Sequence, residues 1–180
     1  ERTIKMKQRL ISAFFGIILL ILVLLGNQTV FGVVVTLISS MAIYEVLGAV
    51  GLKEKKTITA FSVFIPIALM LTPYIFAANM LTVVFIFLAV FLLVMLFNHT
   101  RYSFSDVATA FTSAVMVSVP FLFVSMTRRL GNENLDVLVI LIGSWITDSC
   151  AYFSGYFFGK HKLAPAISPK KTVEGSIGGI

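Results

Sequence analysis

Residues 143–179 read GSWITDSCAYFSGYFFGKHKLAPAISPKKTVEGSIGG and contain the most informative pattern of the sequence. They begin as an apolar run that carries a single acid, Asp148, and continue into a stretch rich in Lys, Ser, Thr, Pro and Gly. An acid near the middle of a membrane-spanning helix costs about 2.5–3.5 kcal/mol on insertion scales, so it needs a reason to be there. The segment therefore predicts a helix with a polar function, followed by the basic loop 159–175.

The composition around this segment is that of a membrane protein. The chain has 180 residues, of which 58% are hydrophobic and 12% charged, whereas soluble domains carry about 25% charged residues. Its mean hydropathy is +1.00, and its one cysteine, Cys150, excludes an intrachain disulfide. At about 20 residues per span, we expect an all-α polytopic membrane protein with about six spans and the start of a further one, the spans covering 10–25, 29–51, 58–72, 80–97, 107–127 and 137–158.

The polar segments predict the domain organisation. A basic N-terminus, 1–9, precedes a four-helix membrane region, 10–97; a linker, 98–106, leads to a central membrane region, 107–180, which contains the basic loop. We set Glu1–Lys5 aside, because these residues precede Met6 and are either an added sequence or part of a longer chain.

The positions of the cations predict the orientation of the chain. Twelve of the 14 Lys and Arg residues fall on one side of the predicted spans, and the connection on the other side holds only Arg128 and Arg129. Because Lys and Arg accumulate in cytoplasmic loops, we expect a cytoplasmic N-terminus and a cytoplasmic basic loop. The net charge of +6 therefore reflects membrane flanks and does not indicate a nucleic-acid partner.

One face of the last predicted helix is polar and small. Ser144, Asp148, Tyr152, Gly155 and Gly159 follow one another at spacings of three and four residues, which places them on one face. Tight packing against another helix, with a hydrogen-bonded acid, is one interpretation of this face. We favour the other, in which the acid faces a water-filled site.

The basic loop offers several nitrogen donors that suit phosphate oxygens: Lys160, His161, Lys162, Lys170 and Lys171. An ordinary cytoplasmic flank, or attraction to anionic lipid headgroups, is the alternative interpretation. The pair Ser168-Pro169 is typical of an N-cap followed by proline at the first helical position. A helix that starts beside paired lysines predicts an anion site.

Three motifs in this region resemble a known family: TDSxAY at 147–152, FGKHKLAP at 158–165 and SPKKTxEGxxGG at 168–179. They are similar to the central region of bacterial phosphatidate cytidylyltransferases, also called CDP-diacylglycerol synthases. The resemblance implies a reaction in phospholipid biosynthesis, in which CTP and phosphatidate give CDP-diacylglycerol and pyrophosphate with Mg²⁺. It also implies an all-helical fold in the inner (cytoplasmic) membrane, with a cavity facing the cytoplasm and a homodimeric assembly.

The same resemblance implies roles for individual residues. Asp148, Lys170 and Lys171 would be catalytic, and Asp148 would be a ligand of the metal. The residues expected to bind substrate are Lys160, His161, Lys162, Ser168, Thr172, Glu174 and Tyr152. In the family, a later segment with a Lys-Asp pair and an Asp-Arg-Asp cluster supplies further metal-binding carboxylates. It would lie beyond Ile180, so we expect the 180 residues to be a fragment that is inactive alone.

Two other functions remain open from the sequence. An acid near the membrane midplane and proline-interrupted spans are also found in transporters and channel subunits. A CTP-dependent enzyme for another lipid acceptor, such as a CDP-archaeol synthase or a polyprenol kinase, would need a similar basic loop. Only an assay with the lipid acceptor separates that reading from the first.

Overall fold

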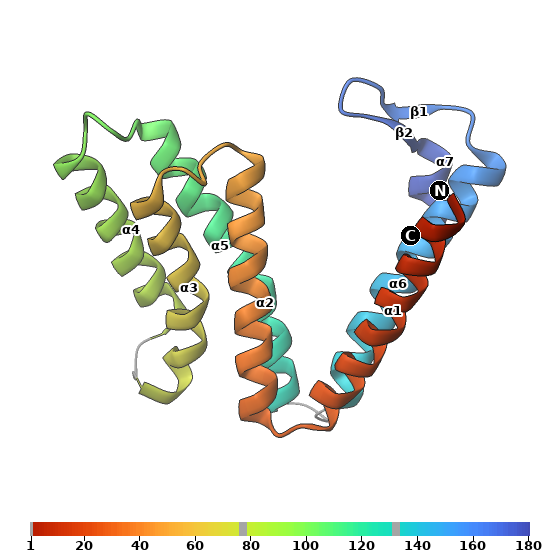
Figure 1. Ribbon diagram of the computed structural model, residues 1–180, viewed down its shortest axis with the longest axis horizontal. Helices are drawn as coiled ribbons and strands as arrows, with labels where there is room; N and C mark the ends of the chain where they lie inside the picture. The colour runs from red at the N-terminus through yellow and green to blue at the C-terminus, as the bar shows by residue number, and fades with distance from the viewer. Residues whose placement is uncertain (1, 76–78, 131–133) are drawn as a thin grey trace. The chain divides into compact units, whose positions relative to one another are not determined.

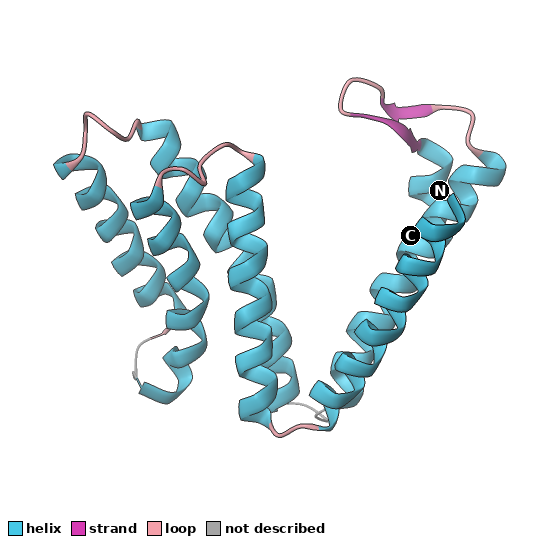
Figure 2. Ribbon diagram, in the orientation of Figure 1, coloured by secondary structure: helices cyan, strands magenta, loops and turns pink. Residues whose placement is uncertain are grey.

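The computed structural model describes residues 2–75, 79–130 and 134–180, with no account of the side chains of 2–13 and 73–75. Within these ranges the chain forms helices and one short hairpin (Figures 1 and 2). The elements in order are α1 (Arg2–Leu25), α2 (Gln28–Ala49), α3 (Lys56–Ile75), α4 (Met80–Phe97), α5 (Phe104–Leu130), α6 (Asn134–Phe158), β1 (Lys162–Ala164), β2 (Ser168–Thr172) and α7 (Val173–Gly178).

The predicted all-α fold is confirmed, and the number of spans stays a prediction. Four helices, α2, α4, α5 and α6, are long and apolar enough to cross a membrane, whereas the apolar stretches Phe14–Leu25 and Lys56–Thr72 are shorter. The predicted bounds of 80–97 agree with α4. The first helix begins at Arg2, so the predicted polar lead 1–9 is helical from its second residue, while Glu1 lies outside the described residues.

Contacts along the chain divide it into two compact units, residues 1–129 and 130–180. The division differs from the linker expected at 98–106, because α5 contributes Val107, Ala110, Ala114 and Leu122 to the same core as α2, α3 and α4. Each unit is described below by itself.

Short polar residues begin the helices of the first unit. The side chain of Asn27 accepts a hydrogen bond from Val30 N at 2.9 Å, and Asn79 does the same for Thr82 N at 3.0 Å. At α5 the exchange is reciprocal: Ser103 N donates to the Asp106 carboxylate at 2.9 Å and Asp106 N donates to Ser103 Oγ at 3.2 Å. These caps satisfy backbone donors that a helix leaves unpaired.

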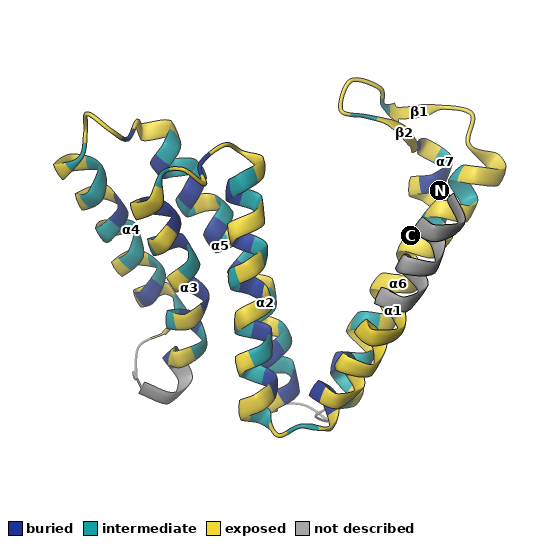
Figure 3. Cartoon of the chain, viewed as in Figure 1, coloured by how far each residue is buried: buried dark blue, intermediate teal, exposed yellow. Residues whose placement is uncertain are grey.

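The core of the first unit combines large apolar residues with buried serines. Buried residues of α2, α3, α4 and α5 form one cluster, among them Phe91, Ile43 and Leu69, and Figure 3 shows the buried positions along these helices in dark blue. Ser62 and Ser118 are also buried, and each donates its hydroxyl to the carbonyl four residues earlier, at 2.8 Å and 2.6 Å. Such small residues let helices approach closely without leaving a polar group unpaired.

Arg128 fastens the end of α5 to the turn between α1 and α2. The sequence placed it in a polar connection, but it belongs to the last turn of α5 and is buried. Its Nη2 donates to the carbonyls of Leu24, at 2.9 Å, and Gly26, at 2.7 Å, and its guanidinium lies 4.6 Å from the centroid of the Phe31 ring. A cation at the C-terminal carbonyls of a helix is favourable, so this side chain is structural.

Arg128→Met is therefore expected to lower the stability of the first unit by about 2 kcal/mol, because hydrogen bonds to a charged group contribute about 1.5–3 kcal/mol. Thermal unfolding of the detergent-solubilised protein measures this loss. Arg101→Met removes an exposed cation and is the matched control. Equal unfolding temperatures for the two variants would contradict the structural role.

Candidate active site

The second unit is built by α7 folding back onto α6. Glycines make this contact possible, since a Cβ on Gly175 would lie 2.9 Å from the carbonyl oxygen of Ala151. A Cβ on Gly178 would lie 2.0 Å from Ser154 Oγ and 2.3 Å from Ser154 Cβ. The glycines of the third motif therefore serve helix packing, and α7 descends along α6 until Gly179 lies beside Thr147.

Thr172 joins the hairpin to α7. Its Oγ1 accepts a hydrogen bond from Gly175 N at 3.2 Å, and it occupies the space that a Cβ on Gly155 would need, at 2.9 Å. A Cβ on Gly155 would also lie 3.4 Å from Gly175 Cα, so this face of α6 packs against α7. Thr172 is buried and caps α7, while its expected contact with substrate stays a prediction.

The predicted helix start at Ser168-Pro169 is wrong. Ser168 begins β2, which pairs antiparallel with β1 through Lys162 opposite Thr172 and Ala164 opposite Ser168. The helix begins only at Val173, with Thr172 as its N-cap. A proline is compatible with a strand at the edge of a sheet, since its missing N–H can face away from the partner.

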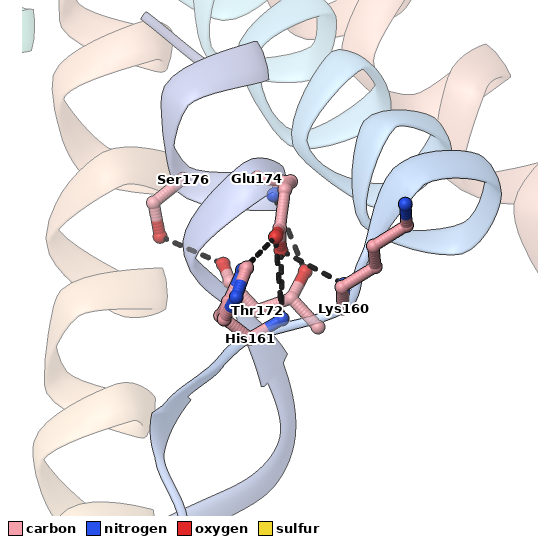
Figure 4. A network of polar contacts seen from close by, with 6 residues as sticks. Lys160, His161, Thr172, Glu174 and Ser176 are labelled. Atoms are coloured by element: carbon pink, nitrogen blue, oxygen red, sulfur yellow. Dashed lines mark hydrogen bonds and ion pairs between the residues drawn. The ribbon is translucent and has the colours of Figure 1, made fainter.

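Glu174 fixes the beginning of the hairpin (Figure 4). Its carboxylate accepts hydrogen bonds from Lys160 N at 3.1 Å and His161 N at 3.2 Å, and lies 2.7 Å from His161 Nδ1. The backbone N–H of Glu174 itself, followed by the His161 side chain, lowers the pKa of this carboxyl from 4.5 to about 2. Glu174 is thus a structural clamp, and the Lys160 amino group points away from it (Figure 4).

Because the folded pKa of Glu174 is depressed, its contribution to stability is complete above pH 4.5 and is lost as the pH falls toward about 2. We expect the Lys160 and His161 amides to lose protection against hydrogen exchange over that range, after correction for intrinsic rates. Glu174→Gln should weaken this protection severalfold at neutral pH, while Glu45→Gln, at an exposed carboxylate of the other unit, should not. Unchanged protection in Glu174→Gln would exclude the clamp.

The hairpin presents its lysines to the surroundings. Lys162 pairs with Thr172, and the register shifts before Ala164 pairs with Ser168. The side chains of Lys162, Lys170 and Lys171 are all exposed, as are those of Lys160 and His161. The structure therefore brings the five predicted phosphate donors onto one hairpin with a fixed base.

Asp148 and Tyr152 lie on α6 beside the packed glycine face and are exposed. Tyr152 stacks on Tyr156, with ring centroids 6.2 Å apart. Since α6 continues for ten residues beyond Asp148, the acid lies about 15 Å along the helix from its hairpin end. No described contact joins it to the lysines, but Gly179 lies at its level, beside Thr147.

Asp148 is the acid of the second unit that suits a hard cation, because its oxygens are exposed and accept no hydrogen bond from the described residues. Over those residues, no group of three or more His, Cys, Asp or Glu side chains could together hold a metal ion. Mg²⁺ commonly uses one or two carboxylates, several waters and substrate phosphates. Asp148 therefore fits as one ligand and cannot hold the ion by itself.

Sequence reasoning missed the part played by Ser154 and Thr147. Both are small residues that face α7. The signal was available in the spacing of Thr147, Ala151 and Ser154 at three and four residues, matched by the Gly-x-x-Gly-Gly run of the third motif.

Comparisons with known proteins place the sequence in a family. The sequence profile of the cytidylyltransferase family matches residues 7–180. The chain is 31% identical to the phosphatidate cytidylyltransferase of Staphylococcus haemolyticus (strain JCSC1435) and 30% identical to that of Staphylococcus aureus (strain COL), in both cases over 97% of this chain and 68% of the relative. The phosphatidate cytidylyltransferase of Staphylococcus saprophyticus is 40% identical over 83 residues, 46% of this chain and 31% of the relative.

No solved structure matches the chain significantly. The profile match covers all three motifs of the second unit as well as the helices of the first, and both longer alignments extend over nearly the whole chain. On this evidence the chain belongs to the cytidylyltransferase family.

Proposed function

We propose that this protein transfers the cytidylyl group of CTP to phosphatidate, giving CDP-diacylglycerol and pyrophosphate. A phosphate oxygen of phosphatidate attacks the α-phosphorus of CTP, and the bond from that phosphorus to the bridging oxygen of the β-phosphate breaks. Family membership and the names of the relatives support this reaction. No observation favours a transporter or a different lipid acceptor.

The observation that carries the proposal is the basic hairpin fixed at the end of α6. Glu174 binds the backbone of Lys160 and His161, just before β1. Thr172, the last residue of β2, packs against Gly155 of α6. Neither contact involves the lysine side chains, because Glu174 binds backbone N–H groups and Thr172 is buried. The side chains of Lys162, Lys170 and Lys171 are therefore exposed. Donors on a fixed backbone need little reorganisation to meet developing negative charge.

Phosphoryl transfer depends mainly on positioning and on charge neutralisation. Two phosphate-bearing substrates must approach each other, and their repulsion has to be offset by cations. Two adjacent exposed lysines of β2, Lys170 and Lys171, can contact two separate phosphate groups at once. We assign one of them to the CTP phosphates and the other to the phosphate of phosphatidate, with Lys160, Lys162 and His161 as further contacts.

We also propose Mg²⁺ as the cofactor, with the Asp148 carboxylate as one ligand. When bound, the ion supplies additional neutralisation of the CTP phosphates. Asp148 would position the ion from α6, at the level where α7 ends. Isothermal titration of Mg²⁺ into the protein with CTP, compared with Asp148→Asn, tests this role without turnover.

The orientation and the assembly are further proposals. The Lys and Arg distribution supports a cytoplasmic N-terminus and a cytoplasmic hairpin in the inner membrane. Labelling of a single cysteine placed at Lys160 from one side of sealed vesicles tests the orientation. The resemblance to the family supports a homodimer, which light scattering in detergent measures.

The test of the function is CTP-dependent formation of CDP-diacylglycerol from phosphatidate and Mg²⁺ by the purified full-length protein in detergent, with pyrophosphate measured in parallel. Equal amounts of the two products are expected. Turnover of CTP with another lipid phosphate, and none with phosphatidate, would show that the other lipid is the acceptor. No CTP turnover with any lipid would remove the proposal.

A further inference from the structure

The first unit contains a groove to which the proposed reaction assigns no role. It has a volume of about 510 Å³ and lies where α2 ends and α3 begins. Its lining consists of Tyr44, Lys53, Glu54, Lys56, Thr59, Ala60, Val63 and Phe64. All of these belong to the first unit, residues 1–129, and none to the basic hairpin.

One end of the groove is cationic. Lys53 and Lys56 carry two positive charges against the single carboxylate of Glu54. The Lys53 amino group is held 4.2 Å above the Tyr44 ring. The neighbouring Lys55 is ion-paired with Asp106 and anchors the turn to α5. The two lining lysines therefore remain for an anion from outside the protein.

The other end of the groove is apolar. Ala60, Val63 and Phe64 line it along α3, and Phe64 is 57% exposed. Eight residues separate Lys56 from Phe64, which corresponds to about 12 Å along the helix. Because α2 is long and apolar enough to span a membrane, the charged end lies at the membrane surface and the apolar end extends toward the hydrocarbon.

We propose that this groove binds an anionic glycerophospholipid, with its phosphate between Lys53 and Lys56 and its glycerol and first methylenes against Val63 and Phe64. A free phosphate would satisfy the lysines but leave the apolar wall uncovered. A lipid matches both ends and the distance between them. The inference depends on the chain spanning a membrane and not on the proposed transfer reaction.

The test compares lipids that differ only in the headgroup. Binding of phosphatidylglycerol and of phosphatidylcholine with the same acyl chains is measured on the delipidated full-length protein by native mass spectrometry, and hydrogen exchange over residues 53–64 locates the bound lipid. We expect preferential binding of phosphatidylglycerol, protection of this segment by it, and no protection by inorganic phosphate in large excess.

Variants then assign the contacts. Each lysine near a membrane surface strengthens anionic-lipid binding about fivefold, so Lys53→Ala/Lys56→Ala should lose roughly 25-fold in phosphatidylglycerol affinity. Lys53→Arg/Lys56→Arg should retain the binding, and Glu54→Gln should strengthen it. Arg101→Ala, which removes an exposed cation outside the groove, is the matched control and should leave the affinity unchanged.

Three results would overturn the proposal: equal affinity for the two lipids, protection of 53–64 by inorganic phosphate alone, or unchanged phosphatidylglycerol binding in the double alanine variant. The second result would identify a site for a soluble anion. Unfolding temperatures of all variants, measured in the same detergent, confirm that a loss of binding is not a loss of fold.

Discussion

Gly178→Ala is expected to detach α7 from α6 and to abolish most of the transferase activity. The added methyl group would lie 2.3 Å from Ser154 Cβ and 2.0 Å from its Oγ. Rotation of Ser154 can move the hydroxyl but not the Cβ, so a helix has to shift. We expect a loss of about 3 kcal/mol, at the upper end of the usual cost of overpacking, and melting of α7 together with the base of the hairpin.

The design offers a matched control and a rescue. Gly143→Ala adds the same methyl group to α6 at a position where nothing lies within 4 Å, and it should be at least as stable as the parent protein, because alanine favours a helix more than glycine does. Ser154→Gly removes the atoms that clash, leaving Cys150 O at 3.5 Å as the next contact. Ser154→Gly/Gly178→Ala should therefore be more stable than Gly178→Ala alone.

Thermal unfolding and hydrogen exchange over residues 168–178 are the measurements. They give a double-mutant cycle that isolates the contact between the two positions. If Ser154→Gly and Gly178→Ala instead add independently, the close packing of α7 on α6 does not exist in solution.

Lys171→Ala is expected to reduce kcat/KM by about 100- to 1000-fold, the range seen when one preorganised donor to a transition state is removed. The side chain is exposed, so its removal should leave the unfolding temperature unchanged. Lys170→Ala should have an effect of similar size, because we assign each of the two exposed lysines to one of the two phosphate-bearing substrates. Lys171→Arg should restore part of the activity.

The same experiment decides between a catalytic hairpin and an ordinary basic flank of a membrane protein. If the lysines only attract anionic lipid, Lys171→Ala will raise KM for phosphatidate, leave kcat unchanged, and lose its effect at high salt. If Lys171 contacts the reacting phosphates, kcat falls and the deficit persists at high salt. Arg101→Ala, outside the hairpin, should change neither parameter.

The all-α class and the family could be predicted from the sequence alone. Long apolar stretches and three motifs with many specified residues are local signals that do not depend on tertiary contacts. The sequence also placed α4 and the end of α6 correctly. The basic hairpin was misread as a helix start at Ser168-Pro169. Capping propensity is a local preference there, and the pairing of β2 with β1 overrides it.

Within the candidate site, the sequence predicted which residues contact substrate, and these roles stay predictions. For Thr172 and Glu174 the structure adds contacts that the sequence did not reveal, because their polar atoms bind the protein's own backbone. Side-chain identity alone does not distinguish a ligand contact from a cap or a clamp. Likewise, the buried position of Arg128 depends on the carbonyls of a turn about one hundred residues earlier in the chain, which no local pattern reveals.

The division of the chain at residue 129 has a consequence for biosynthesis. All core residues of the first unit, and the turn that Arg128 closes, precede α6 in sequence, so this unit can pack before the rest has left the ribosome. The second unit uses contacts between near neighbours in sequence, which form quickly. We therefore expect the hairpin that carries the phosphate-binding lysines to form after the core of the first unit has packed.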